Sequence, residues 1–330
     1  MQGNNREAQG RVSQTLGDAV MRYAAVGFPM PNDIVFRDGR TIKGVMGGGS
    51  FYAYSGLKIC SDDSIFLAAT GDDFEQYFGE WFDRNGCTRD GLMLRTDRCV
   101  YYEVRYRPDG GYDEKSIYTE SYDATTKAEQ FIVASHLEKY FARGIKGVYL
   151  IGNHMDSLYC RTMMRFRDDY GTRIGWEFPP DYQITGPDDP DIRRILGICD
   201  YFSLNRKEAS LYFGTSTDDE SIDAIRRLGI PCYYRVGTDG AYFIDGGRAV
   251  KCPMISIRGR EADIDPTGCG NVSTAAAMWA YFEGWSPERI CTWAGILAGF
   301  NALQYGPCPD AGEKTRSEAL RLLEELAPEK

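Results

Sequence analysis

The sequence predicts an α/β fold: a mostly parallel central sheet covered by helices on both faces, with a small β-sheet as a lid. Three observations support this. After about residue 120, segments with helical periodicity alternate with short apolar runs, the order typical of parallel strands joined by helices. The 330 residues, 43% of them hydrophobic, are enough to bury one large core. Between residues 92 and 118, hydrophobic residues alternate with charged ones, as in an exposed sheet.

The N-terminal part supplies a leader, a first strand and part of the lid. Residues 1–20 are polar and predict a frayed leader, so we expect a single domain over 21–330. The first buried strand is expected at Arg22–Phe28. Two short β-like stretches follow, joined by the hairpin signal Asp38-Gly39. They can form a sheet edge or a small separate sheet, and we assign the lid to about 32–46 and 91–118.

The remaining elements follow in a regular order. Gly47–Gly49 opens a helix of small and aromatic residues. Strands are then expected at 147–153, 173–178, 201–204, 232–237 and 241–250, the last as a hairpin. Helices are expected at 126–143, 155–169, 191–198, 206–213, 221–229, 268–283, 287–305 and 316–326.

Composition excludes several classes of function. The formal net charge is −10 and the acidic residues are dispersed, which disfavours binding to nucleic acids or anionic membranes. Neither a spanning segment of about 20 apolar residues nor a signal-peptide core is present, so we expect a cytoplasmic protein. The ten cysteines are scattered without a CxxC pair, and only two histidines accompany them. Reduced, mostly buried thiols are expected instead of a zinc site.

The clearest chemical signal is the turn Gly268-Cys269-Gly270, which lies directly before a predicted helix. A Gly-X-Gly turn lets backbone N–H groups converge, and the start of the helix adds partial positive charge. Both features stabilise a phosphoryl group. Glycines at such a turn can also serve packing alone, so the residues by themselves leave both interpretations open.

Two further segments are ambiguous on physical grounds. Asn205 at a strand end and Glu208 one turn later can face the same anionic site, but the same spacing forms a helix capping box. The segment from Gly237 through Thr238 to Gly240 follows a strand and is, taken alone, only a good β-turn.

Asp263 to Asn271 resembles the C-terminal signature of the PfkB/ribokinase family of kinases, usually Asp-Thr-x-Gly-Ala-Gly-Asp. The resemblance implies a ribokinase-like fold. It also implies that the backbone of Gly268, Cys269 and Gly270 forms an anion hole around the transferred phosphate. In the family the final Asp takes the proton of the attacking hydroxyl, and here Asn271 stands in its place.

The resemblance extends over most of the chain and assigns further site residues. It implies ATP and Mg²⁺ as cofactors, with K⁺ dependence plausible. Nucleotide binding is implied for Asn205, Glu208, Gly237, Thr238 and Gly240, a metal contact for Glu208, and a monovalent cation for Asp265 and Thr267. Substrate binding is implied for Asp33, Gly48, Gly49 and Tyr52, where Tyr52 takes the place of the family's usual Asn.

Asn271 leaves the activity open. A carboxamide cannot accept a proton at neutral pH, and loss of a general base typically costs about 10² to 10⁴ in rate. Another carboxylate such as Asp33 can substitute, the acceptor hydroxyl can need no base, or the protein can bind without turnover. The motif is similar to that of a branch of the family with Asn at this position, and this similarity favours an altered catalytic mechanism. We expect phosphoryl transfer from ATP to a sugar, polyol or nucleoside-like hydroxyl; the alternative is a weak or inactive protein that binds ligand or nucleotide in a regulatory role.

The lid predicts a partner surface. Its tyrosines can stack on substrate or contact another subunit, and a homodimer through the lid is expected because a small isolated sheet exposes apolar surface. The tyrosines concerned are Tyr101, Tyr102, Tyr106 and Tyr112.

Overall fold

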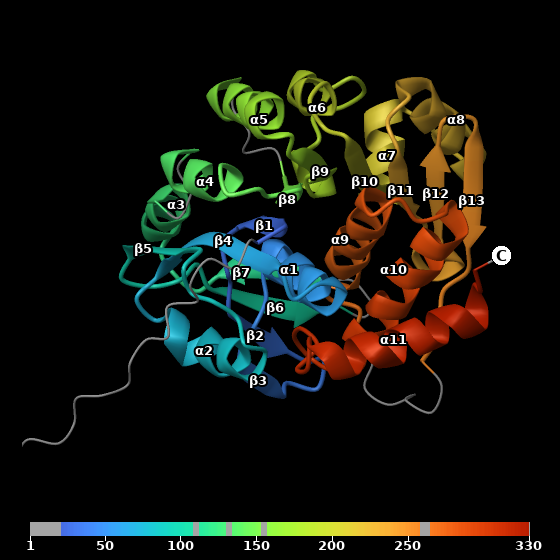
Figure 1. Ribbon diagram of the computed structural model, residues 1–330. Coiled ribbons are helices and arrows are strands. Elements are labelled where there is room, and N and C mark those ends of the chain that lie inside the picture. The colour runs from blue at the N-terminus through green and yellow to red at the C-terminus, as the bar shows by residue number, and fades with distance from the viewer. Residues whose placement is uncertain (1–20, 108–111, 130–133, 153–156, 258–264, 330) are drawn as a thin grey trace, which may run out of the picture.

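The computed structural model describes residues 21–107, 112–129, 134–152, 157–257 and 265–329. Within these ranges a nine-stranded sheet runs through the molecule in the order β13-β12-β11-β10-β9-β8-β1-β4-β5 (Figure 1). Its strands are β1 (Tyr23–Gly27), β4 (Ser64–Gly71), β5 (Leu92–Thr96), β8 (Gly147–Ile151), β9 (Arg173–Glu177), β10 (Tyr201–Asn205), β11 (Cys232–Arg235), β12 (Ala241–Asp245) and β13 (Arg248–Cys252).

In this sheet the seven strands β11-β10-β9-β8-β1-β4-β5 are parallel to one another, and β12 pairs antiparallel with both β11 and β13. Parallel strands bring their carboxyl ends to one edge of the sheet, which is where ligands bind in open α/β sheets. The expected mostly parallel sheet is therefore confirmed, and its carboxyl edge is the place to look for a site.

Helices cover both faces of this sheet (Figure 1). Alternate residues of β1 show why: Tyr23 and Ala25 belong to one buried cluster, Ala24 and Val26 to the other. The first cluster is covered by α1 (Gly49–Cys60), α2 (Phe74–Arg84), α9 (Cys269–Phe282), α10 (Pro287–Asn301) and α11 (Glu313–Leu326). The second is covered by α4 (Ala134–Phe141), α5 (Ser157–Tyr170), α6 (Pro190–Leu196), α7 (Arg206–Phe213) and α8 (Asp218–Leu228).

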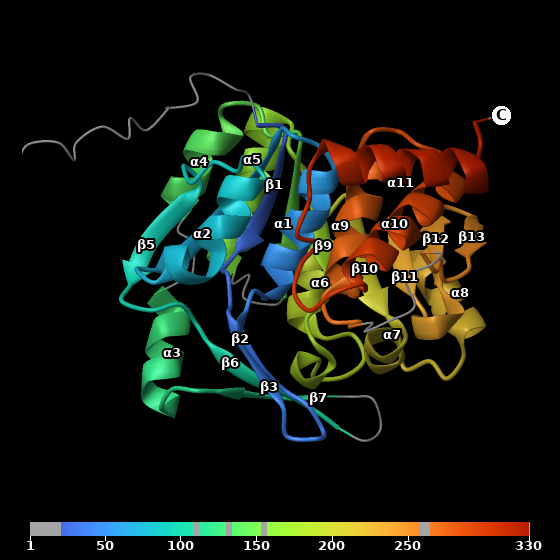
Figure 2. The same cartoon turned by 90° about the horizontal axis from the view of Figure 1, so that it is seen from below.

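A small four-stranded sheet lies apart from the main one, with α3 (Glu120–Glu129) beside it (Figure 2). Its order is β3-β2-β6-β7, and it comprises β2 (Asn32–Val35), β3 (Thr41–Val45), β6 (Tyr102–Tyr106) and β7 (Tyr112–Ser116). The lid sheet is confirmed. Its predicted start at residue 91 is wrong, because β5 pairs with β4 in the main sheet.

Three other expectations need correction. The sequence analysis did not identify β4 or α2 between residues 64 and 84. The single helix expected at 126–143 is instead α3 followed by α4, and residues 130–133 lie outside the described part. The C-terminal helix starts at Glu313, earlier than residue 316.

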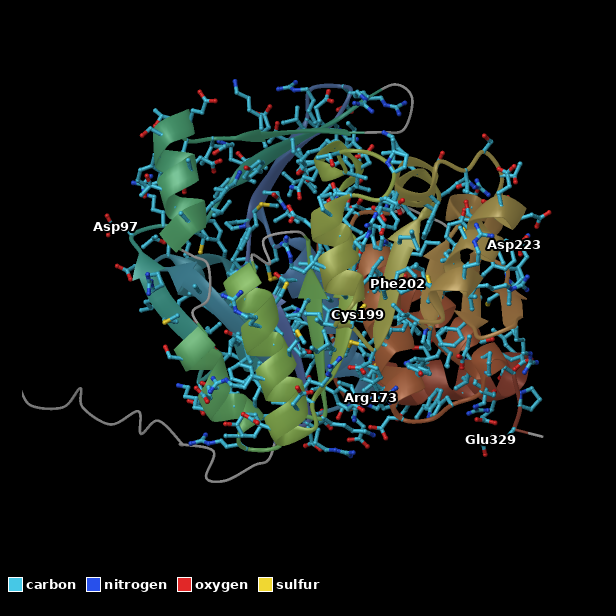
Figure 3. The ribbon with its side chains drawn as sticks, turned by 90° about the horizontal axis from the view of Figure 1, so that it is seen from above. Asp97, Arg173, Cys199, Phe202, Asp223 and Glu329 are labelled. Atoms are coloured by element: carbon cyan, nitrogen blue, oxygen red, sulfur yellow. The ribbon has the colours of Figure 1, made fainter. Side chains whose placement is uncertain are left out.

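Figure 3 shows charged side chains such as Asp97, Asp223 and Glu329 at the periphery, while Cys199 and Phe202 lie inside. All ten cysteines are free, and every one except the half-buried Cys269 is buried, as expected for reduced thiols. No helix in the described residues combines the length and apolarity needed to cross a membrane.

Candidate active site

Three polar side chains end three neighbouring strands at the carboxyl edge of the main sheet. Glu177 is the last residue of β9, Asn205 of β10 and Arg235 of β11. The parallel register pairs Asn205 with Arg235, and Glu177 with Ser203 of the same β10 strand. Asn271 approaches the same edge from the first turn of α9. Topology thus gathers residues that are far apart in the sequence.

The turn before α9 is shaped by two glycines. Gly268 has a left-handed φ of 79°, and a Cβ there would lie 2.2 Å from the ring of Tyr52. A Cβ on Gly270 would lie 2.2 Å from Nη1 of Arg235. A Cβ at Gly268 would collide with the buried ring of Tyr52, and a Cβ at Gly270 would force the end of the Arg235 side chain to move.

Two backbone amides of this turn are available to a ligand. The N–H of Cys269 donates to the carbonyl of Pro266 at 3.1 Å. The carbonyl of Thr267, a natural partner for the next amides, instead accepts from Nδ2 of Asn301 at 2.9 Å. The N–H groups of Gly270 and Asn271 consequently have no hydrogen-bond partner among the described residues. Free amides at a helix start bind anions.

The start of α9 is fixed against the sheet by buried hydrogen bonds. The hydroxyl of Tyr201 donates to the carbonyl of Thr274 at 3.1 Å, and the hydroxyl of Thr274 donates to that of Ser203 at 2.9 Å. The free amides of the turn are therefore held on a rigid element and need no reorganisation to meet an anion.

Asn271 belongs to a buried polar cluster that the sequence did not predict. Its Nδ2 donates to Oε1 of Glu177 at 3.2 Å and lies 3.5 Å from the hydroxyl of Tyr149. Nη1 of Arg235 contacts the same Oε1 at 2.8 Å, and Tyr149 donates to Oε2. Glu177 is 4% exposed. Burial, together with the nearby Glu177 carboxylate, raises the pKa of Tyr149 well above its usual value, so the phenol remains a donor.

Asn205 and Glu208 form a capping box at the start of α7. Oδ1 of Asn205 accepts from the backbone of Lys207 and Glu208, and Glu208 accepts from the Asn205 backbone at 2.7 Å. Burial raises the pKa of Glu208 to about 7, partly offset by Arg235, whose Nη2 lies 3.6 Å from Oε2. The sequence left two interpretations open, an anionic-ligand site and a helix capping box, and the structure contains the capping box.

The N-terminal residues predicted to bind substrate lie in two elements: Asp33 is on lid strand β2, and Gly48, Gly49 and Tyr52 are at the start of α1. Oδ1 of Asp33 on β2 accepts from the backbone of Gly44 at 3.1 Å and from the hydroxyl of Tyr101 at 2.5 Å. Gly49 adjoins the amide of Asn271, since a Cβ there would lie 3.1 Å from Nδ2. Gly48, with a left-handed φ of 95°, is the N-cap of α1. Tyr52 is 3% exposed and packs under Gly268, so its ring supports the turn.

Asp265 and Thr267 lie between the small sheet and α10. Oδ1 of Asp265 accepts from the hydroxyl of Tyr106 at 2.6 Å and from the N–H of Thr267 at 3.0 Å. Its Oδ2 and the Oδ1 of Asn301 are buried, and neither has a hydrogen-bond partner in the described part of the chain. Buried oxygens without a hydrogen-bond partner are candidate ligands for a cation.

A cavity of about 330 Å³ adjoins this loop, and its lining comes from both the small sheet and the body. Phe36 and Tyr106 line it on one side, and Pro266 and Tyr305 on the other. The small sheet thus lines an open cavity next to the loop that leads into the Gly268 turn, as expected of a lid.

The predicted nucleotide turn follows Arg235 directly. Gly237 (φ 67°) and Thr238 are exposed in a short 3₁₀ turn, Gly237–Asp239. A Cβ on Gly240 would lie 2.1 Å from the carbonyl of Cys252, so this glycine is required by packing against β13. The turn is open to solvent at the carboxyl edge of the sheet.

Several site residues were missed. The hydroxyls of Tyr101 and Tyr106, which were expected at a dimer contact, bind Asp33 and Asp265 within the chain, and the dimer contact stays a prediction. Tyr102 donates to Asp123, and the side chain of Tyr112 lies outside the described part. Glu177 and Arg235 carried one available signal: each is a charged residue at the end of a buried apolar strand.

No family model and no curated protein matches this sequence. Solved structures do match. A ribokinase from Arabidopsis thaliana, complexed with ribose and ATP, is 18% identical with a TM-score of 0.70 over 93% of this chain and 99% of that one. An Escherichia coli protein assigned as a ribokinase II, in complex with ATP and Mg²⁺, is 14% identical with a TM-score of 0.74 over 92% and 99%. A Burkholderia thailandensis nucleoside kinase in complex with inosine is 16% identical with a TM-score of 0.68 over 92% and 97%. The chain therefore has the ribokinase-like fold.

Proposed function

We propose that the protein is an ATP-dependent kinase that transfers the γ-phosphoryl group to a hydroxyl of a sugar, polyol or nucleoside-like molecule. One observation carries the proposal: the amides of Gly270 and Asn271, at the positive end of α9, have no hydrogen-bond partner among the described residues. The ribose- and inosine-bound structures of similar fold support this class of acceptor.

Asp33 orients the acceptor in this mechanism. Its Oδ1 is fixed by Gly44 and Tyr101, which leaves Oδ2 for a substrate hydroxyl. The reacting hydroxyl oxygen forms a bond to the γ-phosphorus of ATP while the bond to the β-bridging oxygen breaks, giving ADP and a phosphate monoester. The amides of Gly270 and Asn271 stabilise the charge on the transferring group.

The hydroxyl proton needs no strong base. In a loose transition state the attacking oxygen carries little bond to phosphorus, so the proton leaves late and reaches water or a phosphate oxygen. Asn271 then accepts a hydrogen bond from the hydroxyl through its Oδ1 without taking the proton.

The cofactor sites are proposals of unequal fit. Among the described residues no cluster of three or more His, Cys, Asp or Glu side chains is placed to hold a metal ion. Mg²⁺, which neutralises phosphate charge when bound, is usually held through phosphates and water with few protein ligands. Glu208 fits such a water-mediated contact, because each oxygen retains a lone pair beyond its bond to Asn205. The unpaired oxygens of Asp265 and Asn301 fit a monovalent cation: Thr267 lies in the loop of Asp265, and Asn301, at the end of α10, donates to its carbonyl.

A second candidate function follows from Asn271. A kinase fold that lacks the family's proton acceptor can bind nucleotide or substrate in a regulatory role without turnover. Arg235 also lies against the Glu208 carboxylate, where it competes with any cation. A regulatory protein therefore remains the alternative.

Calorimetry followed by an activity assay separates the kinase from the regulatory protein. Titration with Mg-ATP comes first, followed by an ATP-consumption assay over a panel of sugars, polyols and nucleosides. The proposal expects binding and turnover on at least one acceptor. Binding without turnover on any acceptor favours the regulatory role, and absence of nucleotide binding rejects the kinase and leaves only a regulatory role through another ligand.

A further inference from the structure

Asn271 does not act alone, because its amide is bound by a buried carboxylate. Nδ2 lies 3.2 Å from Oε1 of Glu177. A carboxylate accepts hydrogen bonds and repels a carbonyl oxygen, so it selects the NH₂ side of the amide. Oδ1 must then point away from Glu177.

The opposite side of the amide is open. Oδ1 of Asn271 accepts no hydrogen bond from any residue that the structure describes, and it is not one of the buried polar atoms without a partner. It therefore remains accessible, on the side of the amide turned away from Glu177, as an acceptor for a hydroxyl.

Glu177 is itself held in place from two sides. Arg235 contacts its Oε1 at 2.8 Å and Tyr149 donates to Oε2. Gly270, which has no Cβ, leaves the space that Nη1 of Arg235 occupies. A buried carboxylate costs free energy unless it is paired, and this one is satisfied by three donors.

We propose that Glu177 is a positioning residue that fixes the carboxamide of Asn271 with Oδ1 toward the acceptor hydroxyl. The inference rests on the proposed kinase function and deepens it. Glu177 and Asn271 together replace the single carboxylate of the usual signature: the negative charge sits on Glu177, paired with Arg235, and the acceptor atom sits on Asn271.

One consequence is that Asp cannot simply be restored at position 271. In Asn271→Asp two carboxylates would lie within hydrogen-bond distance, and such a pair shares a proton. The groups that face this pair are the Tyr149 hydroxyl and the Arg235 guanidinium, with Glu208 beyond the arginine. Exchanging the two functional groups, as in Asn271→Asp with Glu177→Gln, keeps one donor, one acceptor and the same net charge.

The test is a double-mutant cycle of E177Q, N271D and the double variant, measured by kinetics and by thermal unfolding between pH 5 and pH 9. E177Q should lower kcat about 10- to 100-fold, the range of one hydrogen bond to a charged group, with little change in KM for ATP. N271D should show a new inflection near neutral pH in both readouts. The double variant should lose that inflection and exceed the activity expected from the product of the single effects by at least about tenfold.

The matched control is Glu283→Gln at the opposite edge of the sheet. Glu283 also accepts from a tyrosine, Tyr23, and pairs with a cation, Lys146 at 2.8 Å. E283Q should lower stability and leave kcat and its pH profile unchanged. A fall in kcat equal to that of E177Q would assign both effects to folding and overturn the inference.

The thermal readout separates this inference from the proposed function. Coupling between positions 177 and 271 in thermal unfolding supports the fixed amide even where no acceptor is turned over, an outcome that rejects only the kinase activity. Additive effects in both readouts overturn the positioning role, whether or not the wild type is active.

Discussion

Tyr106 of the lid sheet donates a hydrogen bond of 2.6 Å to Oδ1 of Asp265, in the loop that leads into the Gly268 turn. The same hydroxyl lies 3.1 Å from Oγ1 of Thr267. A lid strand is thus tied directly to the loop that we propose as the monovalent-cation site, so lid position and cation binding should be coupled.

Tyr106→Phe should weaken that coupling. Loss of a hydrogen bond to a charged group costs about 1.5 to 3 kcal/mol of unfolding free energy. The Tyr106→Phe variant should also need a higher K⁺ concentration for half-maximal turnover, measured by titrating KCl against a constant background of tetramethylammonium chloride. Tyr102→Phe is the matched control, because it removes a Tyr–Asp bond of 3.2 Å from the same strand. An equal K⁺ requirement in both variants would contradict the coupling.

The alternating order of elements was enough to predict the parallel sheet, because buried strands and amphipathic helices each leave a local pattern. The strand β4 was missed although its eight residues are all buried. It is a continuous apolar run without alternation, which periodicity alone does not separate from a buried helix. The misplaced start of the lid has a related cause: β5 is partly exposed at the sheet edge and has the composition of a lid strand.

The site was predictable only where one segment carries it. The turn at Gly268 and Gly270 is local in the sequence, and its free amides follow from Asn301 binding the Thr267 carbonyl. The contact of Asn271 with Glu177 joins residues 94 positions apart, and only the packing of α9 against β9 brings them together. Long-range polar contacts of this kind leave no spacing pattern.

Gly270→Ala should damage the site more than the fold. The new Cβ would lie 2.2 Å from Nη1 of Arg235, so the guanidinium must leave Glu177. We expect turnover to fall at least about 100-fold, since both the charge pair and the turn are disturbed, and stability to fall by about 1 to 3 kcal/mol. Steady-state kinetics and urea denaturation measure the two effects.

The control for that variant is Gly247→Ala, where no atom lies within 4 Å of the new Cβ. It should leave both turnover and stability nearly unchanged. A Gly270→Ala protein with normal turnover would argue against close contact between Arg235 and the turn during catalysis.

Glu208 should make the protein less stable as the pH rises. Its pKa is raised from 4.5 to about 7, chiefly by burial, so the folded state binds the proton more tightly than the unfolded state. The resulting stabilisation is complete below about pH 4.5 and is lost as the pH rises through about 7. Between pH 5 and pH 8 the loss should be about 2 kcal/mol.

Urea denaturation of the wild type and of Glu208→Gln, with EDTA present, checks this. The difference in unfolding free energy between the two proteins should change across that pH range, because Gln does not titrate. A constant difference from pH 5 to pH 8 would show that Glu208 is ionised throughout, with Arg235 at 3.6 Å compensating its burial.

The outer surface of the lid should form a dimer contact. Tyr101 and Tyr106 are used inside the subunit, so the apolar surface available on the lid comes from other residues: Ile42 on β3 is 38% exposed, and Ile117, just after β7, is 50% exposed. Exposed apolar side chains on a small sheet favour association.

Ile42→Asp and Ile117→Asp should each convert a dimer to a monomer in size-exclusion chromatography with light scattering. Leu211→Asp on α7, where the side chain is 37% exposed, should leave the mass unchanged. A wild-type protein that elutes as a monomer at all concentrations, or a dimer that both lid variants preserve, would place these isoleucines outside any subunit interface.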